Sequence, residues 1–293
     1  MSGGLAVPAL PRTAGAAAAE LRRRFAAAGV ENPAGDAEVL LAWLLGCDRA
    51  RLHAHPETGL SLSLVERLDA AAARREGREP LAYITGEKEF WSLPFRVGPG
   101  VLVPRPETEL LVERGIALLR EREAPLILDL GTGSGAVAVA LAHELPRARV
   151  IATDVSETAL RCARENARRN GVESRVELLR ADLSGGLPEG AFDLVVSNPP
   201  YVPSGEIAGL MPEVSRHEPV EALDGGPDGM RFLRAIIRGA PARLRPGGAL
   251  LLETAPGQIP LCLAEARAAG AFAEPRAWRD LAGRERVLEA VRA

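Results

Sequence analysis

The apolar residues in the second half of the chain form short uninterrupted runs that alternate with amphipathic stretches. Five runs have the length and composition of buried strands, over residues 126–130, 149–153, 176–179, 192–197 and 249–253. The stretches between and after them show helical spacing, over residues 136–145, 156–169, 229–243 and 259–269. This alternation predicts a doubly wound, mostly parallel α/β sheet. A closing strand pair near Ala277 and over residues 286–290 makes it seven-stranded. Between the fourth and fifth strands we expect a long irregular connection, over residues 202–227.

The first part of the chain differs from the second in composition and in the spacing of its apolar residues. Residues 14–77 are rich in Ala and Leu at helical spacing. One helix is expected over residues 20–28, a second with Asp36 as its N-terminal cap, and a third opened by Ser63. These elements predict a small N-terminal helical bundle.

Aromatic and alternating residues over 89–97 then predict a short hairpin, and Pro106 begins a further helix. We therefore expect three parts: a helical bundle over residues 1–80, a hairpin linker over 81–104, and the α/β domain over 105–293.

A glycine-rich loop follows the first strand of the α/β domain, with the sequence Gly131-Thr132-Gly133-Ser134-Gly135. Its glycines let the backbone turn tightly and approach a ligand, and the next helix directs free N–H groups there. Asp154, at the end of the second strand, lies where an acid binds a ribose. The loop alone leaves nicotinamide, flavin and nucleoside cofactors open.

The fourth strand ends in Asn198-Pro199-Pro200-Tyr201. Two successive prolines lack N–H groups and have fixed φ, so the turn is stiff and offers only carbonyl acceptors. Asn198 adds an acceptor oxygen and Tyr201 a flat ring. Such a turn suits a planar group that carries an –NH2, and it favours methyl transfer to an amide or exocyclic amine over hydride transfer. The alternative is a proline-rich surface turn with an incidental asparagine.

Composition limits the remaining classes. The net charge is −3 and the first 85 residues carry ten Arg and ten acidic residues, whereas a nucleic-acid binder displays a basic face. The cysteines, Cys47, Cys162 and Cys262, lack metal-ligand spacing and fit reduced thiols. No apolar run approaches the roughly 20 residues of a membrane helix. We expect a cytoplasmic monomer that binds no metal, membrane or nucleic acid.

The motifs together resemble the class I methyltransferases, which have a Rossmann-like fold and use S-adenosylmethionine. Three further segments resemble the HemK/PrmC family: residues 90–95 (Phe-Trp-Ser-Leu-Pro-Phe), 104–109 (Pro-Arg-Pro-Glu-Thr-Glu), and the stretch from His217-Glu218-Pro219 to Gly229. The resemblance implies methylation of the side-chain amide nitrogen, N5, of the glutamine in the Gly-Gly-Gln loop of class-1 peptide chain release factors, which modulates translation termination.

The same resemblance implies the site residues. The cofactor is expected to lie against Gly131, Thr132, Gly133, Ser134 and Gly135 at its methionine end, Asp154 at its ribose, and Asp182 and Leu183 at its adenine. Asn198, Pro199, Pro200 and Tyr201 are the expected catalytic and substrate-binding residues, with Asn198 also beside the cofactor. The chain departs from the family at Leu183, often aromatic there, and at Thr254-Ala255, commonly Ile-Gly.

In this interpretation Asn198 Oδ1 and the Pro199 carbonyl accept the two amide hydrogens of the glutamine and direct its nitrogen at the methyl group. For Tyr201 we expect the ring rather than the hydroxyl to matter. One rival is a nucleic-acid amine methyltransferase, because the same turn accepts a flipped adenine or guanine. The second is a cofactor-binding scaffold that docks a partner through the helical bundle without methylating it.

Overall fold

The computed structural model describes residues 10–183 and 185–293. Residues 1–9 of the expected helical bundle therefore lie outside the described part. Contacts within the chain divide it into two units. The first is Met1–Gly86 with Pro212–His217, and the second is Glu87–Met211 with Glu218–Ala293.

The first unit is helical. Its described residues form α1 (Ala14–Ala27), α2 (Pro33–Leu45), α3 (Arg49–Ala54), α4 (Leu62–Glu76), α5 (Leu81–Thr85) and α9 (Pro212–His217). Leu21, Phe25, Leu40 and Leu68 are fully buried at its centre, where α1, α2 and α4 meet. The predicted N-terminal helical bundle is confirmed.

Two predicted caps of this bundle are wrong. The second helix begins at Pro33, and Asn32 rather than Asp36 accepts the capping hydrogen bond, from the Gly35 N–H. Asp36 instead lies in the first turn, where its charge complements the helix dipole. The third long helix is capped by Ser61 rather than Ser63, through the Leu64 N–H. In both helices a polar residue that comes earlier in the chain than the predicted cap accepts the hydrogen bond from a free N–H group of the first turn.

The second unit contains a seven-stranded sheet with the order β5-β4-β3-β6-β7-β9-β8. Its strands are β3 (Leu126–Leu130), β4 (Arg149–Asp154), β5 (Val176–Arg180), β6 (Phe192–Ser197), β7 (Leu244–Glu253), β8 (Phe272–Arg279) and β9 (Glu285–Arg292). The first five are parallel and the last two antiparallel. This arrangement confirms the predicted doubly wound, mostly parallel sheet. The order reverses between β3 and β6, and ligands of such sheets bind at this point.

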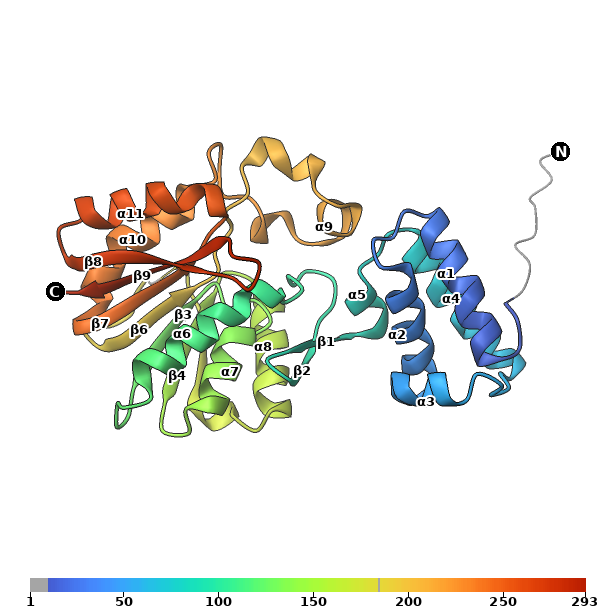
Figure 1. Cartoon of the computed structure of the whole chain (residues 1–293). Coiled ribbons are helices and arrows are strands. Elements are labelled where there is room, and N and C mark those ends of the chain that lie inside the picture. The colour runs from blue at the N-terminus through green and yellow to red at the C-terminus, as the bar shows by residue number, and fades with distance from the viewer. Residues whose placement is uncertain (1–9, 184) are drawn as a thin grey trace. The chain divides into compact units, whose positions relative to one another are not determined.

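Helices cover both faces of this sheet (Figure 1). On one face lie α6 (Glu109–Leu119), α7 (Ala136–Glu144) and α8 (Glu157–Arg169), and on the other α10 (Arg231–Arg243) and α11 (Ile259–Ala268). Each face of the sheet has its own hydrophobic core. Within β3, Ile127 packs into the core beside α6 and α7, and its neighbour Leu128 packs into the core beside α10. Burial on both faces explains why these strands read as continuous apolar runs.

The hairpin of β1 (Glu87–Phe90) and β2 (Leu93–Arg96) also belongs to the second unit. Phe90 and Phe95 meet edge to face, with ring centroids 5.9 Å apart, and pack into the core beside α6 and α7. The helix expected from Pro106 is divided into a 3₁₀ turn, η1 (Pro106–Thr108), followed by α6.

The expectation of an irregular connection over residues 202–227 is only partly right. The connection holds the short helices η3 (Ser204–Gly209), α9 and η4 (Val220–Ala222). Each begins at or directly after a proline, whose fixed φ suits a first helical turn. Two further 3₁₀ turns of the second unit are η2 (Glu173–Arg175) and η5 (Pro256–Gln258).

Candidate active site

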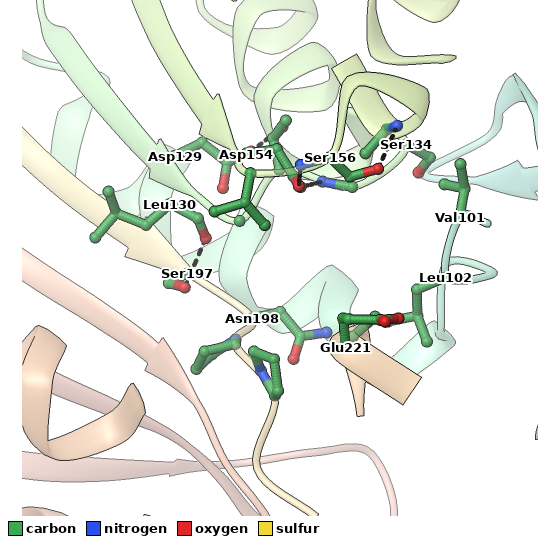
Figure 2. A pocket seen from close by; sticks show the side chains of 18 of the residues that line it. Val101, Leu102, Asp129, Leu130, Ser134, Asp154, Ser156, Ser197, Asn198 and Glu221 are labelled. Atoms are coloured by element: carbon green, nitrogen blue, oxygen red, sulfur yellow. Dashed lines mark hydrogen bonds between the residues drawn. The ribbon is translucent and has the colours of Figure 1, made fainter. Parts of the chain in front are cut away.

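One pocket lies at the carboxyl ends of β3, β4 and β6, within the second unit. Its volume is about 480 Å³, in the range of small-molecule sites. Figure 2 shows Asp129, Asp154, Ser156 and Ser134 along one side of the pocket and Asn198 and Glu221 along the other. The remaining walls come mainly from residues 100–105 and 181–183.

The glycine loop forms the wall that follows β3. Gly131, Gly133 and Gly135 all have positive φ, of +69°, +56° and +81°, a conformation that costs other residues energy. A Cβ on Gly135 would lie 3.0 Å from the Cβ of Ala163 in α8, so this glycine also permits close helix packing. Gly131, Thr132, Gly133 and Ser134 line the pocket, whereas Gly135 does not.

Asp154 links β4 to this loop. Its Oδ2 accepts a hydrogen bond from the Gly133 N–H at 2.9 Å, and its Oδ1 accepts one from the Ser156 N–H at 2.9 Å. Ser156 in turn caps α8 through the Ala159 N–H. The carboxylate is thus held rigidly at the pocket wall, with lone pairs left for hydroxyl donors.

Asp182 and Leu183 line the next part of the pocket. The Leu183 backbone has a positive φ of +50°, and its carbonyl accepts a hydrogen bond from the Thr153 hydroxyl at 3.0 Å. Thr153 is fully buried in β4, so the strand itself fixes the course of this turn.

The turn after β6 forms the opposite wall through Asn198, Pro199 and Pro200. It is anchored on β3 by the Ser197 hydroxyl, which donates to the Leu130 carbonyl at 2.7 Å. The Asn198 amide donates from Nδ2 to Thr108 Oγ1 at 3.1 Å. Its donor end is therefore bound to the protein, and Oδ1 is the acceptor end of the amide.

Tyr201 does not line the pocket. Its ring packs against the core beside α10 and α11, and its hydroxyl donates to Glu253 Oε1 at 3.3 Å. Burial and the nearby Glu253 charge raise the pKa of this hydroxyl, so it remains a donor. The Tyr201 carbonyl accepts a hydrogen bond from Gln258 Nε2 at 2.8 Å, which fixes the exit of the turn.

The pocket is rich in carboxyl groups. Asp129, Asp154, Asp182 and Glu221 line it. Burial raises the pKa of Asp129 to about 7, although the hydrogen bond from the Thr132 hydroxyl opposes the shift. Arg105 also lines the pocket, but it is paired with the buried carboxyl of Glu218. This donor set fits a cationic ligand with ribose hydroxyls, such as S-adenosylmethionine, whose sulfur is positively charged. Among the described residues no group of His, Cys, Asp and Glu could hold a metal ion.

Thr108, Phe232 and Glu253 are among the residues of this region that have no role in the sequence analysis. Thr108 and Phe232 line the pocket, and Glu253 contacts the turn from behind. Thr108 lies within the quoted Pro-Arg-Pro-Glu-Thr-Glu segment, so that segment was a signal for it. Phe232 has no comparable signal in the sequence.

Comparison with known proteins decides the family. A model of the PrmC N-terminal domain matches residues 16–86, and a methyltransferase small domain model matches residues 107–212. A release factor glutamine methyltransferase of Moorella thermoacetica is 47% identical over 273 residues, which cover 93% of this chain and 96% of that protein. The chain belongs to the release factor glutamine methyltransferase family. Another relative of the same name, from Cereibacter sphaeroides, is 46% identical over 91% of this chain and 94% of its own length.

Solved structures support the fold of this family member. A Pyrococcus furiosus methyltransferase aligns with a TM-score of 0.51 at 21% identity, over 76% of this chain and 96% of its own. A Thermus thermophilus 16S rRNA methyltransferase solved with AdoMet and guanosine aligns with the same score at 24% identity, over 71% of this chain and 50% of its own. At these identities the likeness shows the fold alone. No helix among residues 10–183 and 185–293 has the length and apolar character needed to cross a bilayer.

Proposed function

We propose that this chain transfers the methyl group of S-adenosylmethionine to N5 of a glutamine side chain in a peptide chain release factor. The target is the glutamine of the Gly-Gly-Gln motif of class-1 release factors, and its methylation modulates translation termination. The observation that carries the proposal is one pocket with the glycine loop on one side and Asn198, Pro199 and Pro200 on the other. The high identity to named release factor glutamine methyltransferases supports it.

The cofactor assignment follows the pocket walls. S-adenosylmethionine, when bound, supplies a methyl group on a positively charged sulfur. Gly131 to Gly135 lie at its methionine end, and Asp154 accepts hydrogen bonds from the ribose hydroxyls. Asp182 and Leu183 flank the adenine. The support for this assignment is that all of these residues except Gly135 line the same pocket.

The substrate amide requires precise positioning because its nitrogen is a poor nucleophile, with a lone pair delocalised into its own carbonyl. Asn198 Oδ1 and the Pro199 carbonyl accept the two N–H hydrogens. They aim the nitrogen at the methyl group and favour the positive charge that develops on it. Tyr201 completes the proposed substrate-binding set Asn198, Pro199, Pro200 and Tyr201 from behind, because its ring packs against the core and shapes the turn.

The partner of the reaction is a protein. The first unit recognises the release factor, and the enzyme acts as a cytoplasmic monomer without contacting nucleic acid. The net charge of −3 supports the last point, because phosphate contacts need an excess of Lys and Arg.

The proposal is tested by incubating the protein with methyl-labelled S-adenosylmethionine and, separately, a class-1 release factor, total RNA or DNA. We expect label on the release factor, located by tandem mass spectrometry on the glutamine of Gly-Gly-Gln. A release factor with that glutamine replaced by alanine is the matched control and should remain unlabelled. Label on RNA or DNA instead would favour a nucleic-acid amine methyltransferase, and no label on any of the three would favour the scaffold.

A further inference from the structure

The buried side chain of Gln258, the last residue of η5, has no role in the reaction proposed above. Gln258 is 8% exposed, and its amide joins three segments of the second unit. Nε2 donates to the Tyr201 carbonyl at 2.8 Å and to the Gly229 carbonyl at 3.2 Å, while Oε1 accepts from the Ala255 N–H at 3.1 Å. A backbone N–H only donates and a carbonyl only accepts, so these partners fix the orientation of the amide.

Helix capping explains only one end of this amide. A glutamine or glutamate in the first turn of a helix commonly accepts a hydrogen bond from the N–H of the residue before the helix, and either residue type serves. The contact with Ala255 is of this kind. The hydrogen bonds to Tyr201 and Gly229 instead use the two hydrogens of Nε2, which a glutamate lacks. The donor end of Gln258 therefore needs a different explanation.

The turn after β6 requires donors from elsewhere in the protein. Pro199 and Pro200 carry no N–H, so at these positions the backbone can be held only through its carbonyls. The entrance of the turn is anchored by the Ser197 hydroxyl on β3, and its exit by Gln258 at the Tyr201 carbonyl. Because the proline rings also fix φ, anchoring both ends leaves the Pro199 carbonyl little freedom.

The Gly229 carbonyl belongs to the segment that leads into α10. A Cβ on Gly229 would overlap both Gln258 Nε2 and the Tyr201 carbonyl, so a glycine is needed for the amide to reach both carbonyls. Gln258 thereby ties the exit of the turn to the start of α10. The contact also gives a reason for the last glycine of the segment that resembles the HemK/PrmC family.

We propose that Gln258 is a positioning residue for methyl transfer: its –NH2 holds the Tyr201 carbonyl and so fixes the turn in which Asn198 Oδ1 and the Pro199 carbonyl accept the hydrogens of the substrate amide. A misplacement of about 1 Å can lower a rate about 100-fold. The glycine loop forms the opposite wall of the pocket, so the cofactor should bind normally without this contact. The inference rests on the proposed function and extends it to a residue outside the Asn-Pro-Pro-Tyr turn.

The kinetic test compares two variants of similar side-chain size. Gln258→Glu keeps the acceptor for the Ala255 N–H but replaces the –NH2 by an oxygen, and Gln258→Met removes all three hydrogen bonds without adding a charge. In both we expect kcat on a release factor to fall at least about tenfold, with KM and the Kd of S-adenosylmethionine within about threefold. A side chain that only packs or caps would leave kcat unchanged in Gln258→Glu, and that result would overturn the proposal.

Glu265→Gln is the matched control on the same helix. Glu265 lies in α11 and pairs with Arg234 at 3.4 Å and Arg238 at 2.9 Å, both in α10. The variant removes these ion pairs at constant size and leaves the contacts of Gln258 in place, so kcat should equal that of the wild type. A loss of kcat as large as in Gln258→Glu would show that any loosening of α11 suffices, which would overturn the specific role of Gln258.

A spectroscopic test follows the contact without turnover. Tyr201-Val202 is the only Tyr-Val pair in the sequence, so ¹³C-carbonyl tyrosine combined with ¹⁵N-valine gives one correlated NMR signal, from this peptide bond. The signal should shift in Gln258→Met, because the Tyr201 carbonyl loses a hydrogen bond, and should stay in place in Glu265→Gln. An unmoved signal in Gln258→Met would overturn the inference.

A last measurement needs no variant. Gln258 is the only glutamine in the sequence, so ¹⁵N-glutamine labelling identifies its –NH2 group directly. Both hydrogens should exchange slowly with water, because both are hydrogen-bonded, and exchange as fast as in free glutamine would overturn the inference. If the wild type fails to methylate a release factor, the proposed function fails, while the two NMR measurements still decide whether Gln258 holds the turn.

Discussion

The Asp154 carboxylate accepts a hydrogen bond from the Gly133 N–H at 2.9 Å, so one side chain at the end of β4 holds the glycine loop that follows β3. The same carboxylate is the proposed ligand of the cofactor ribose. Removing it should therefore affect cofactor binding twice, by the loss of an acceptor and by the release of the loop.

Asp154→Ala should weaken S-adenosylmethionine binding by about 10- to 100-fold, because charge-assisted hydrogen bonds contribute about 1.5–3 kcal/mol. Isothermal titration calorimetry measures the change directly. At saturating cofactor, kcat should fall much less than the affinity. An affinity within twofold of the wild type would remove Asp154 from the cofactor site.

Alanine substitutions at two glycines of the loop should lower the free energy of unfolding by different amounts. Gly135→Ala meets both a positive φ and a contact of 3.0 Å with Ala163, whereas Gly133→Ala meets a positive φ in open space. We expect a loss of unfolding free energy of about 3 kcal/mol for Gly135→Ala and about 1 kcal/mol for Gly133→Ala. Urea unfolding of both variants measures the difference, and an equal loss would contradict the packing argument.

We expect the first unit to lose stability at acid pH because of the ion pairs that Glu213 forms. Its carboxylate, on α9, accepts hydrogen bonds from Arg75 at 2.8 Å and Arg78 at 2.7 Å. Burial alone would raise the pKa of Glu213, but the hydrogen bonds from Arg78 and Arg75 lower it to about 2 from an ordinary value of 4.5. Since the folded-state pKa is depressed, this stabilisation is complete above pH 4.5 and is lost as the pH falls towards 2.

The matched variant for this effect is Glu213→Gln. At pH 7 it should lower the unfolding free energy by about 2 kcal/mol. The difference from the wild type should shrink as the pH is lowered from 4.5 to 3, which thermal unfolding at each pH measures. A difference that is constant over this range would show that the carboxylate charge contributes nothing.

For Tyr201 the ring and the hydroxyl can be separated. The ring packs against the core and shapes the turn, so Tyr201→Ala should lose most turnover. Tyr201→Phe keeps the ring and removes only the hydroxyl that donates to Glu253 Oε1, so its kcat should stay within about threefold, with a stability loss of about 1 kcal/mol. Steady-state kinetics on both variants decides the point; loss of activity in Tyr201→Phe would assign the role to the hydroxyl.

The sequence predicted best the elements whose pattern has one physical cause. The strand over residues 192–197 was predicted with its observed bounds, because a parallel strand buried on both faces is a continuous apolar run. Ser156 was correctly predicted to open α8, since its capping partner is only three residues away. Both signals are local.

The parts that could not be predicted depend on contacts between distant residues. Nothing in the local pattern assigns α9 to the first unit, because the hydrogen bond that holds it joins Arg75 to Glu213, 138 residues apart. Similarly, Thr108 and Asn198 lie 90 residues apart, and their pairing arises only once η1 and the turn after β6 meet. Motifs located the glycine loop, Asp154 and the turn after β6, which line the pocket, whereas the contacts that orient these residues could not be predicted.

The most direct test of the account is a single-turnover measurement of methyl transfer to a release factor by Asn198→Ala at saturating cofactor. The account predicts a rate constant at least about 100-fold below that of the wild type, with cofactor affinity within about threefold, because Asn198 positions the substrate nitrogen. Asn170→Ala, which alters an asparagine bound to the Pro94 carbonyl, serves as the control and should react at the wild-type rate. A wild-type rate constant in Asn198→Ala, or a loss explained entirely by weaker cofactor binding, would contradict the account.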